Sequence, residues 1–332
     1  MNLSKIGWCD FSWNPVTGCR NNCYFCYGRH QAARLCGTVR INLGDPQIQK
    51  GPKRGLYILP APFHNDSDKV IAYPAGFAPT LHPYRLGMIA AKKKPANIYV
   101  CSTGELFGEW IPEKWIDLVF DACKAAPWHN YMFLTKHPHR YAQLSDAGKL
   151  IEQDNFWYGS YLSDERTPFL SERYHTFGYI DLSSPHASPC ALPDFEWIII
   201  GCDTPVFKHD EPPSRTSLEE ILQDKGSRPL FMKDSQLMRS IWNGPLVQDF
   251  PILLQHEPDR PIPHCKHCKQ CQIIGEGKRG NRHICRHRKV LKEHKDGAMS
   301  PEDMQEHLPN GAQNDGGYDD VQVINKPELP EK

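Results

Sequence analysis

Near its N-terminus the chain reads Thr17-Gly18-Cys19-Arg20-Asn21-Asn22-Cys23-Tyr24-Phe25-Cys26-Tyr27, so that three cysteines have the spacing C-x3-C-x2-C. Three thiolates on one short loop do not complete a structural zinc site, which takes four protein ligands. They suit a cubane iron–sulfur cluster with one open iron, because full protein ligation of such a cluster takes four cysteines. The open iron is a place for a small ligand to bind. A partial zinc site or three buried core thiols are the alternatives.

The segments on either side place this loop in a fold. The stretch 8–13 alternates as a strand does and ends at Asn14-Pro15, and a helix is predicted to begin near Tyr27. The three cysteines would then lie at the carboxyl end of a strand. Barrel and open α/β enzymes carry their chemistry at that end.

The composition of the chain limits the kinds of protein that it can be. The chain has 332 residues, and its 39 Lys and Arg balance its 39 Asp and Glu, so net charge indicates no particular partner. Seven of the thirteen cysteines fall into two tight clusters, which favours metal or iron–sulfur binding over a disulfide framework. The N-terminus lacks the apolar core of a signal peptide, and no apolar run reaches the length of a membrane span. We therefore expect a cytoplasmic protein with no membrane partner.

Short apolar runs alternate with helical segments as far as residue 233. The predicted strands after the first are 96–101, 131–136, 156–161, 176–181, 196–201 and 229–233, and the predicted helices are 112–126, 140–150 and 217–225. This alternation predicts parallel βα units. The predicted fold class is α/β, a partial (β/α) barrel of six or seven parallel strands. An open doubly wound sheet is the alternative architecture.

The chain divides into three predicted parts. Residues 1–258 form the barrel, with 37–80 as an insertion packed over it, because Gly and Pro are frequent there and no helical period holds. Residues 259–295 form a small Cys/His-rich basic module for metal binding. Residues 296–332 are acidic and poor in apolar side chains, and are predicted to be a disordered tail.

The three-cysteine loop, with an aromatic residue just before the third cysteine, resembles the radical S-adenosylmethionine (SAM) superfamily. The resemblance implies that Cys19, Cys23 and Cys26 hold a [4Fe-4S] cluster whose fourth iron is chelated by SAM. It also implies a flavodoxin- or ferredoxin-type electron donor as a partner. As a motif it needs its structural context to be confirmed.

A more particular resemblance runs over about residues 10–255. It is carried in order by 12–19, Leu106-Phe107, 134–140, 198–201 and 231–233. These segments resemble a phage- and plasmid-borne family of radical-SAM-like proteins of unknown function. The chain departs from that family's pattern in two places. Many relatives have Asp at the position of Glu105, and they have a Gly-Gly-Glu-like turn at 201–203. This family likeness implies no substrate.

A Gly-Glu pair follows the second predicted strand. In radical SAM proteins a Gly-Gly-Glu-like turn at this place contacts the amino group of SAM, and Gly104-Glu105 resembles it, with Thr103 in place of the first glycine. A glycine lets the backbone approach a ligand closely, and a carboxylate accepts hydrogen bonds from an ammonium group. A turn with an exposed acid would explain the same pair.

Charged residues also end or closely follow three later strands. Lys136 and Lys233 are candidates to face the SAM carboxylate or a phosphorylated substrate, and Asp203 is a candidate to bind the ribose hydroxyls or a substrate. Exposed surface charges are the alternative for all three. His137 and His139 are expected to be solvated residues at the start of a helix.

A second cysteine cluster has the spacing Cys265-x2-Cys268-x2-Cys271-x13-Cys285, with histidines between. Four cysteines complete either a second [4Fe-4S] cluster or, with histidines, a zinc knuckle. So polar a segment cannot fold on its own core, and a bound metal would supply its folding energy. Its basic residues suit phosphate backbones, which makes nucleic acid a candidate partner, while a solubilising surface would explain them as well.

Two functional hypotheses follow. In the first, the protein is a radical SAM enzyme that reductively cleaves SAM to a 5′-deoxyadenosyl radical, which acts on an unknown substrate such as a nucleotide or nucleic acid. In the second, it is a non-catalytic iron–sulfur or zinc protein that binds nucleic acid. A thiol oxidoreductase using Cys23 and Cys26 is a distant third, because Cys19 would then have no role.

Overall fold

The computed structural model describes residues 2–4, 6–21, 23, 26–36, 55–65, 67–162, 166–182, 192–202 and 215–255, and strands at 271–277, 280–285 and 321–323. Most of the predicted C-terminal module and nearly all of the predicted tail fall outside these residues, so both stay predictions. No helix in the described part of the chain is long and apolar enough to cross a membrane.

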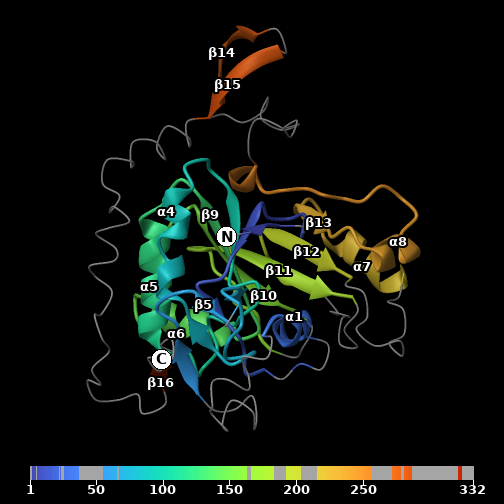
Figure 1. Ribbon diagram of the computed structural model, residues 1–332. Helices are drawn as coiled ribbons and strands as arrows, with labels where there is room; N and C mark the ends of the chain where they lie inside the picture. Colours follow the sequence, from blue (N-terminus) through green and yellow to red (C-terminus); the bar gives the residue numbers. More distant parts are fainter. Residues whose placement is uncertain are drawn as a thin grey trace, which may run out of the picture.

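One large sheet organises the chain (Figure 1). In spatial order its strands are β1 Asn2–Leu3, β2 Phe11–Trp13, β8 Asn97–Val100, β9 Asn130–Thr135, β10 Phe156–Tyr161, β11 His175–Asp181, β12 Trp197–Gly201 and β13 Leu230–Met232. Every neighbouring pair from β2 to β13 is parallel, and only β1 runs antiparallel among these strands. The predicted partial barrel of parallel strands is confirmed. Because strand order follows chain order without the reversal that a doubly wound sheet needs, the alternative architecture is wrong.

Among the described residues, helices lie in the connections from β2 to β8, from β8 to β9, from β9 to β10 and from β12 to β13. The described helices are α1 Tyr27–Leu35, α4 Met88–Ala91, α5 Glu113–Lys124, α6 His139–Asp146, α7 Arg215–Asp224 and α8 Gln236–Ile241, with 3-10 turns η1 Pro83–Arg85 and η2 Ile252–Leu254. The predicted helices correspond to α1, α5, α6 and α7. The short α4 and α8 were not predicted. In Figure 1, α4, α5 and α6 lie along one side of the sheet, and α7 and α8 lie beyond β13.

Alternate residues of each strand pack on opposite faces of the sheet. Val100 and Phe133 face outward into a core that includes Phe120 of α5. Met132 and Trp197 face the other side, where Trp8 joins them in a separate aromatic core. The side chain of Trp8 is 1% exposed, so the chain just before β2 fills part of the barrel interior.

A small second sheet lies beside the three-cysteine loop. Its strands, in order, are β16 Val321–Val323, β4 Leu56–Ile58, β7 Thr80–Leu81 and β3 Val16–Thr17. Two further hairpins pair β5 Phe63–His64 with β6 Val70–Ile71, and β14 Cys271–Gly277 with β15 Gly280–Cys285. The described part of the predicted insertion therefore supplies β4 and the start of β7, and β7 pairs with β3, directly before the cysteines.

His175, at the start of β11, gives the fold a pH-dependent contact. Its Nδ1 lies 2.8 Å from Glu196 Oε2 and its Nε2 lies 3.9 Å from Asp154 Oδ1. The hydrogen bond with Glu196 raises the pKa of His175, although burial opposes it.

The Glu196→Gln variant should therefore lose stability in a pH-dependent way. A raised folded-state pKa gives stability that is fully present below the unfolded pKa of about 6.5 and is lost as pH rises through the folded pKa. We expect urea unfolding to separate wild type from Glu196→Gln most below pH ~6.5 and least in alkaline buffer. An equal separation at every pH would contradict this account.

Candidate functional site

The three-cysteine loop leaves the carboxyl end of β2, as predicted. β2 ends at Trp13, and α1 begins at Tyr27 directly after Cys26. Cys26 is the N-cap of α1, where its sulfur accepts a hydrogen bond from the backbone N–H of Arg29. The loop therefore lies at the edge of the sheet where the turns after β8, β9 and β13 also emerge.

The segment just before the cysteines is fixed by contacts to two other turns. The indole N–H of Trp13 donates to the Arg85 carbonyl at 2.9 Å, and Arg85 in turn donates to the Asn14 carbonyl at 2.9 Å. The side-chain oxygen of Asn14 accepts from Ser102 Oγ at 3.2 Å and from the Thr103 N–H at 3.1 Å. Trp13 and Asn14, within the segment 12–19 that carries the family resemblance, thus have a structural role, which is to position the loop.

Gly18 and Gly104 bring the loop and the turn after β8 into direct backbone contact. The Gly18 N–H donates to the Thr103 carbonyl at 3.0 Å, and the Gly18 carbonyl accepts from the Glu105 N–H at 3.1 Å. A Cβ at Gly104 would lie 2.7 Å from the Val16 carbonyl oxygen. Gly18 has φ +84°, and a Cβ there would lie 2.2 Å from the Ala78 carbonyl oxygen. Glycine is required at both positions because backbone atoms of a neighbouring segment occupy the place that a Cβ would take.

Each of the three sulfurs has a hydrogen-bond donor. Cys19 accepts from the Asn21 N–H at 3.3 Å, Cys26 from the Arg29 N–H at 3.4 Å, and Cys23 from the Lys136 ammonium at 3.6 Å. Burial raises the pKa of the Cys19 thiol well above its usual range, and the negative charge of Glu105 adds to the effect. Burial also raises the pKa of Cys26, against the influence of Arg29.

Glu105 is buried, with 5% of its surface exposed, so the alternative explanation of the Gly-Glu pair, a turn with an exposed acid, is wrong. Its Oε1 accepts from Thr135 Oγ1 at 2.6 Å and from the Phe107 N–H at 3.1 Å, and its Oε2 accepts from the Lys136 N–H at 3.2 Å. Burial raises the pKa of this carboxyl, and the three hydrogen bonds oppose the rise. The carboxylate therefore ties the turn after β8 to the end of β9. Its predicted contact with SAM stays a prediction.

Lys136 directly follows β9, as predicted, and reaches toward the cysteines. Its ammonium contacts Cys23 and lies 3.9 Å from the centre of the Tyr161 ring. The Tyr161 hydroxyl donates to Asp181 Oδ2 at 3.0 Å, and its ring stacks on Tyr179 at 5.4 Å. A continuous line of polar and aromatic groups thus runs from the loop along the ends of β9, β10 and β11.

His137 does not have the solvated position that we expected. It is 7% exposed, and its Nε2 lies 2.6 Å from the Asn21 side-chain oxygen. It also meets the Trp110 ring edge-on at 5.1 Å. The expectation is wrong because Asn21, far away in the sequence, covers this end of β9. His139 is partly exposed and pairs with Glu109.

The other predicted site residues are less fully described. Lys233 directly follows β13, and its N–H donates to the Ile200 carbonyl at 2.9 Å. Asp203, Cys265 and Cys268 lie outside the described residues. The register of β14 and β15 places Cys271 opposite Cys285. The second metal site, its iron–sulfur or zinc content and its contact with nucleic acid stay predictions.

Sequence reasoning missed several residues of this edge. They are Asn21, His137, Tyr161, Tyr179 and Asp181. Tyr161 and Asp181 end predicted strands of a parallel sheet, and that signal would have placed them at the site. Nothing in the sequence marks Asn21 and His137 as partners, because their contact depends on how the loop folds back.

Comparison with known proteins places the chain in a family. The chain belongs to the DUF5131 family, described as protein of unknown function, whose match spans residues 3–201. That span contains the three-cysteine loop, Glu105 and Lys136. The expected phage- and plasmid-borne character of the relatives stays a prediction. No curated protein matches the chain.

Among solved structures, the matches include two spore photoproduct lyase structures. One has bound AdoMet and dinucleoside spore photoproduct, and the other is complexed with dinucleoside spore photoproduct. Each match has a TM-score of 0.34 and 10% sequence identity, and the aligned region covers 97% of this chain and 78% of the lyase chain. A likeness at this TM-score supports no conclusion about the chain's activity.

The Gly18→Ala variant tests the contact between the loop and its neighbours. Gly148→Ala is the matched control, because Gly148 also has a positive φ (+67°) but a Cβ there would meet nothing within 4 Å. The control should lose about 1–2 kcal/mol for the left-handed conformation. Gly18→Ala should lose a further ~1–3 kcal/mol because a backbone carbonyl must move. Equal losses in urea unfolding would show that the loop is not clamped at Gly18.

Proposed function

We propose that Cys19, Cys23 and Cys26 hold a [4Fe-4S] cluster with one open iron, and that the protein is a radical SAM enzyme. The observation that carries the proposal is the position of the loop. It follows the first parallel strand of a partial barrel, at the carboxyl edge of the sheet, and it contains the C-x3-C-x2-C spacing. The family match adds no activity, because the family's function is not established.

The residues around the loop fit such a cluster. A cluster held by three thiolates carries negative charge and is tuned by hydrogen bonds to its sulfurs. Two backbone N–H groups and the Lys136 ammonium donate to the three sulfurs. Lys136 and Arg29 also bring positive charge to Cys23 and Cys26. Raised thiol pKa values at Cys19 and Cys26 mean that bound iron must displace protons, as metal binding to thiols generally does.

With SAM bound, such a cluster supplies reductive cleavage of SAM to methionine and a 5′-deoxyadenosyl radical. The part of this chain is to position and enclose the reacting groups. Gly18 and Gly104 set the position of the loop, and Glu105 fixes the end of β9 against it. Lys136, Tyr161 and Asp181 form the adjoining wall, where a cation, an aromatic ring and a carboxylate meet the ligand or substrate.

The proposal also covers partners, a second metal site and ligand contacts. We propose that a flavodoxin- or ferredoxin-type protein donates the electron, and that the substrate is a nucleotide or nucleic acid. The four cysteines at 265, 268, 271 and 285 are proposed to hold a second [4Fe-4S] cluster or zinc. Gly104, Lys233 and Asp203 are kept as proposed contacts to SAM or substrate.

Metal analysis and EPR of the anaerobically reconstituted protein test the proposal. Cys19→Ala should remove about four irons and four sulfides per chain, together with an EPR signal that SAM perturbs. Cys36→Ala is the matched control, because Cys36 is a buried cysteine just after α1 whose thiol donates to the Ala33 carbonyl, outside the motif. This control should keep both the iron and the signal.

Either of two outcomes would overturn the enzymatic proposal. One is full iron content in Cys19→Ala, which would place the cluster elsewhere. The other is a wild-type signal that SAM leaves unchanged, together with no 5′-deoxyadenosine after reduction. The same metal analysis and EPR on the Cys268→Ala variant distinguish the proposed C-terminal metal from the iron of the loop, because this variant should lose only the C-terminal metal.

A further inference from the structure

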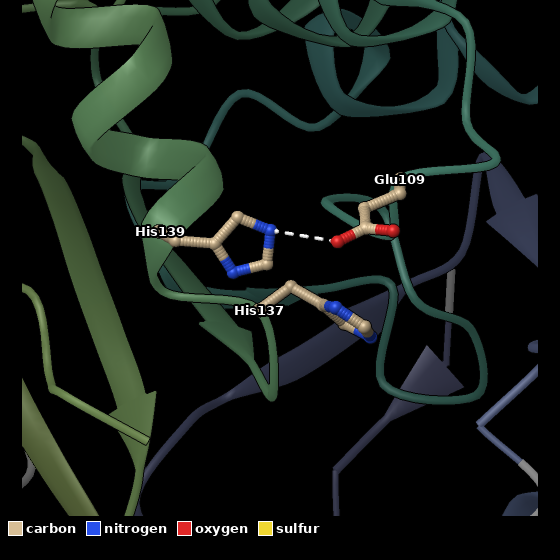
Figure 2. Close-up of side chains that lie close together, drawn as sticks. All are labelled: Glu109, His137 and His139. Carbon is tan, nitrogen blue, oxygen red and sulfur yellow. Dashed lines mark ion pairs between the residues drawn. The ribbon is translucent and has the colours of Figure 1, made fainter.

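Three potential metal ligands meet beside the three-cysteine loop, outside the set of cysteines. They are Glu109, His137 and His139, and their ligand atoms all lie within 4.8 Å of one another. Glu109 comes from the turn before α5, His137 follows β9, and His139 is the first residue of α6. Figure 2 shows the three side chains converging from these separate elements.

The geometry points to a binding site for a divalent transition-metal ion formed by Glu109, His137 and His139. Two imidazoles and one carboxylate are a ligand set that zinc and non-haem iron use when open coordination positions remain. The inference does not rest on the proposed cluster, because none of these ligands is a cysteine of the loop.

The spacing of the ligand atoms suits such an ion. Metal–ligand bonds of ~2.0–2.1 Å place ligand atoms about 3.3 Å apart in a tetrahedral site. His139 Nε2 already lies 3.2 Å from Glu109 Oε1. The side chains of Glu109 and His139 are 73% and 44% exposed, so both have room to close on an ion while water fills the open positions.

The contact with the loop fixes the tautomer of His137 that metal binding through Nδ1 requires. The side-chain oxygen of Asn21 only accepts hydrogen bonds, so the Nε2 of His137, 2.6 Å away, carries the proton. In the neutral ring Nδ1 then has the lone pair that a metal needs. Metal-binding histidines commonly donate their other N–H to an oxygen in this way, which fixes the ring. Trp110 packs edge-on against the same ring at 5.1 Å.

Two basic residues flank the ligands in the sequence, and both have other partners. Arg140, next to His139, pairs with Glu113 at 3.4 Å, and the ammonium of Lys136, next to His137, contacts Cys23 and the Tyr161 ring. An ion pair between His139 and Glu109 would explain the contact of those two residues. It would not explain why the buried His137, oriented by Asn21, joins them.

Co²⁺ titration followed by absorption spectroscopy tests the site in the full-length protein. A histidine–carboxylate site gives cobalt d–d bands without the sulfur-to-metal charge transfer that cysteine sites give, so the two kinds of site are distinguished in one experiment. We expect one Co²⁺ per chain with the sulfur-free spectrum, displaced by Zn²⁺.

Glu109→Gln and His139→Gln change exposed side chains and should leave the fold intact. Each should weaken the sulfur-free Co²⁺ binding at least about 100-fold, because even the loss of an outer-shell partner weakens metal sites 10–100-fold. His64→Gln, in β5, is the matched control and should bind as wild type does. Asn21→Ala should weaken binding about 10–100-fold through His137.

The inference is overturned if wild type shows no sulfur-free Co²⁺ spectrum. It is equally overturned if that spectrum survives unchanged in both Glu109→Gln and His139→Gln. These outcomes are independent of the iron content of Cys19→Ala, so failure of this site and failure of the proposed cluster are distinguishable.

Discussion

The site depends on two peptide hydrogen bonds that join the three-cysteine loop to the turn after β8. Gly18 donates to Thr103 and accepts from Glu105, so the loop continues the pairing of β2 with β8 past the end of both strands. Backbone contact this close leaves no room for side chains, which explains glycine at 18 and 104. Because the cysteines follow at once, any change in this pairing would move the first sulfur.

Glu105 extends the same constraint to the next strand. A buried carboxylate is costly to desolvate, and the cost is offset only if its oxygens accept good hydrogen bonds. Here the donors come from Thr135 and from the backbone of Phe107 and Lys136. The carboxyl thus holds the ends of β8 and β9 in register at the site. Burial is the main reason that the pKa of Cys19 is raised, and the negative charge of Glu105 adds to it. The nearby Lys136 ammonium favours the charged form of Glu105.

Much of this arrangement could be predicted from local sequence, and the rest depends on long-range contacts. Each parallel strand is a short apolar run between turn residues, so periodicity located β9 to β13, and strand ends located Lys136 and Lys233. The two-residue strands β3 and β7 are too short to carry a periodic signal, and they pair with each other across more than sixty residues. His137 was misplaced for the same reason. A histidine beside a helix start looks solvated until Asn21 folds over it.

The end of β9 makes the side-chain contacts that hold the three-cysteine loop in place. Lys136 and His137 are consecutive, yet one contacts Cys23 and the other contacts Asn21, so both hold the same short loop from one side. Glu105 fixes the backbone of Lys136 from the other side. A loop held at its sulfur, at its amide side chain and at Gly18 has little freedom to rearrange. Preorganisation of this kind is what a site needs when its ligands must keep their geometry while small molecules come and go.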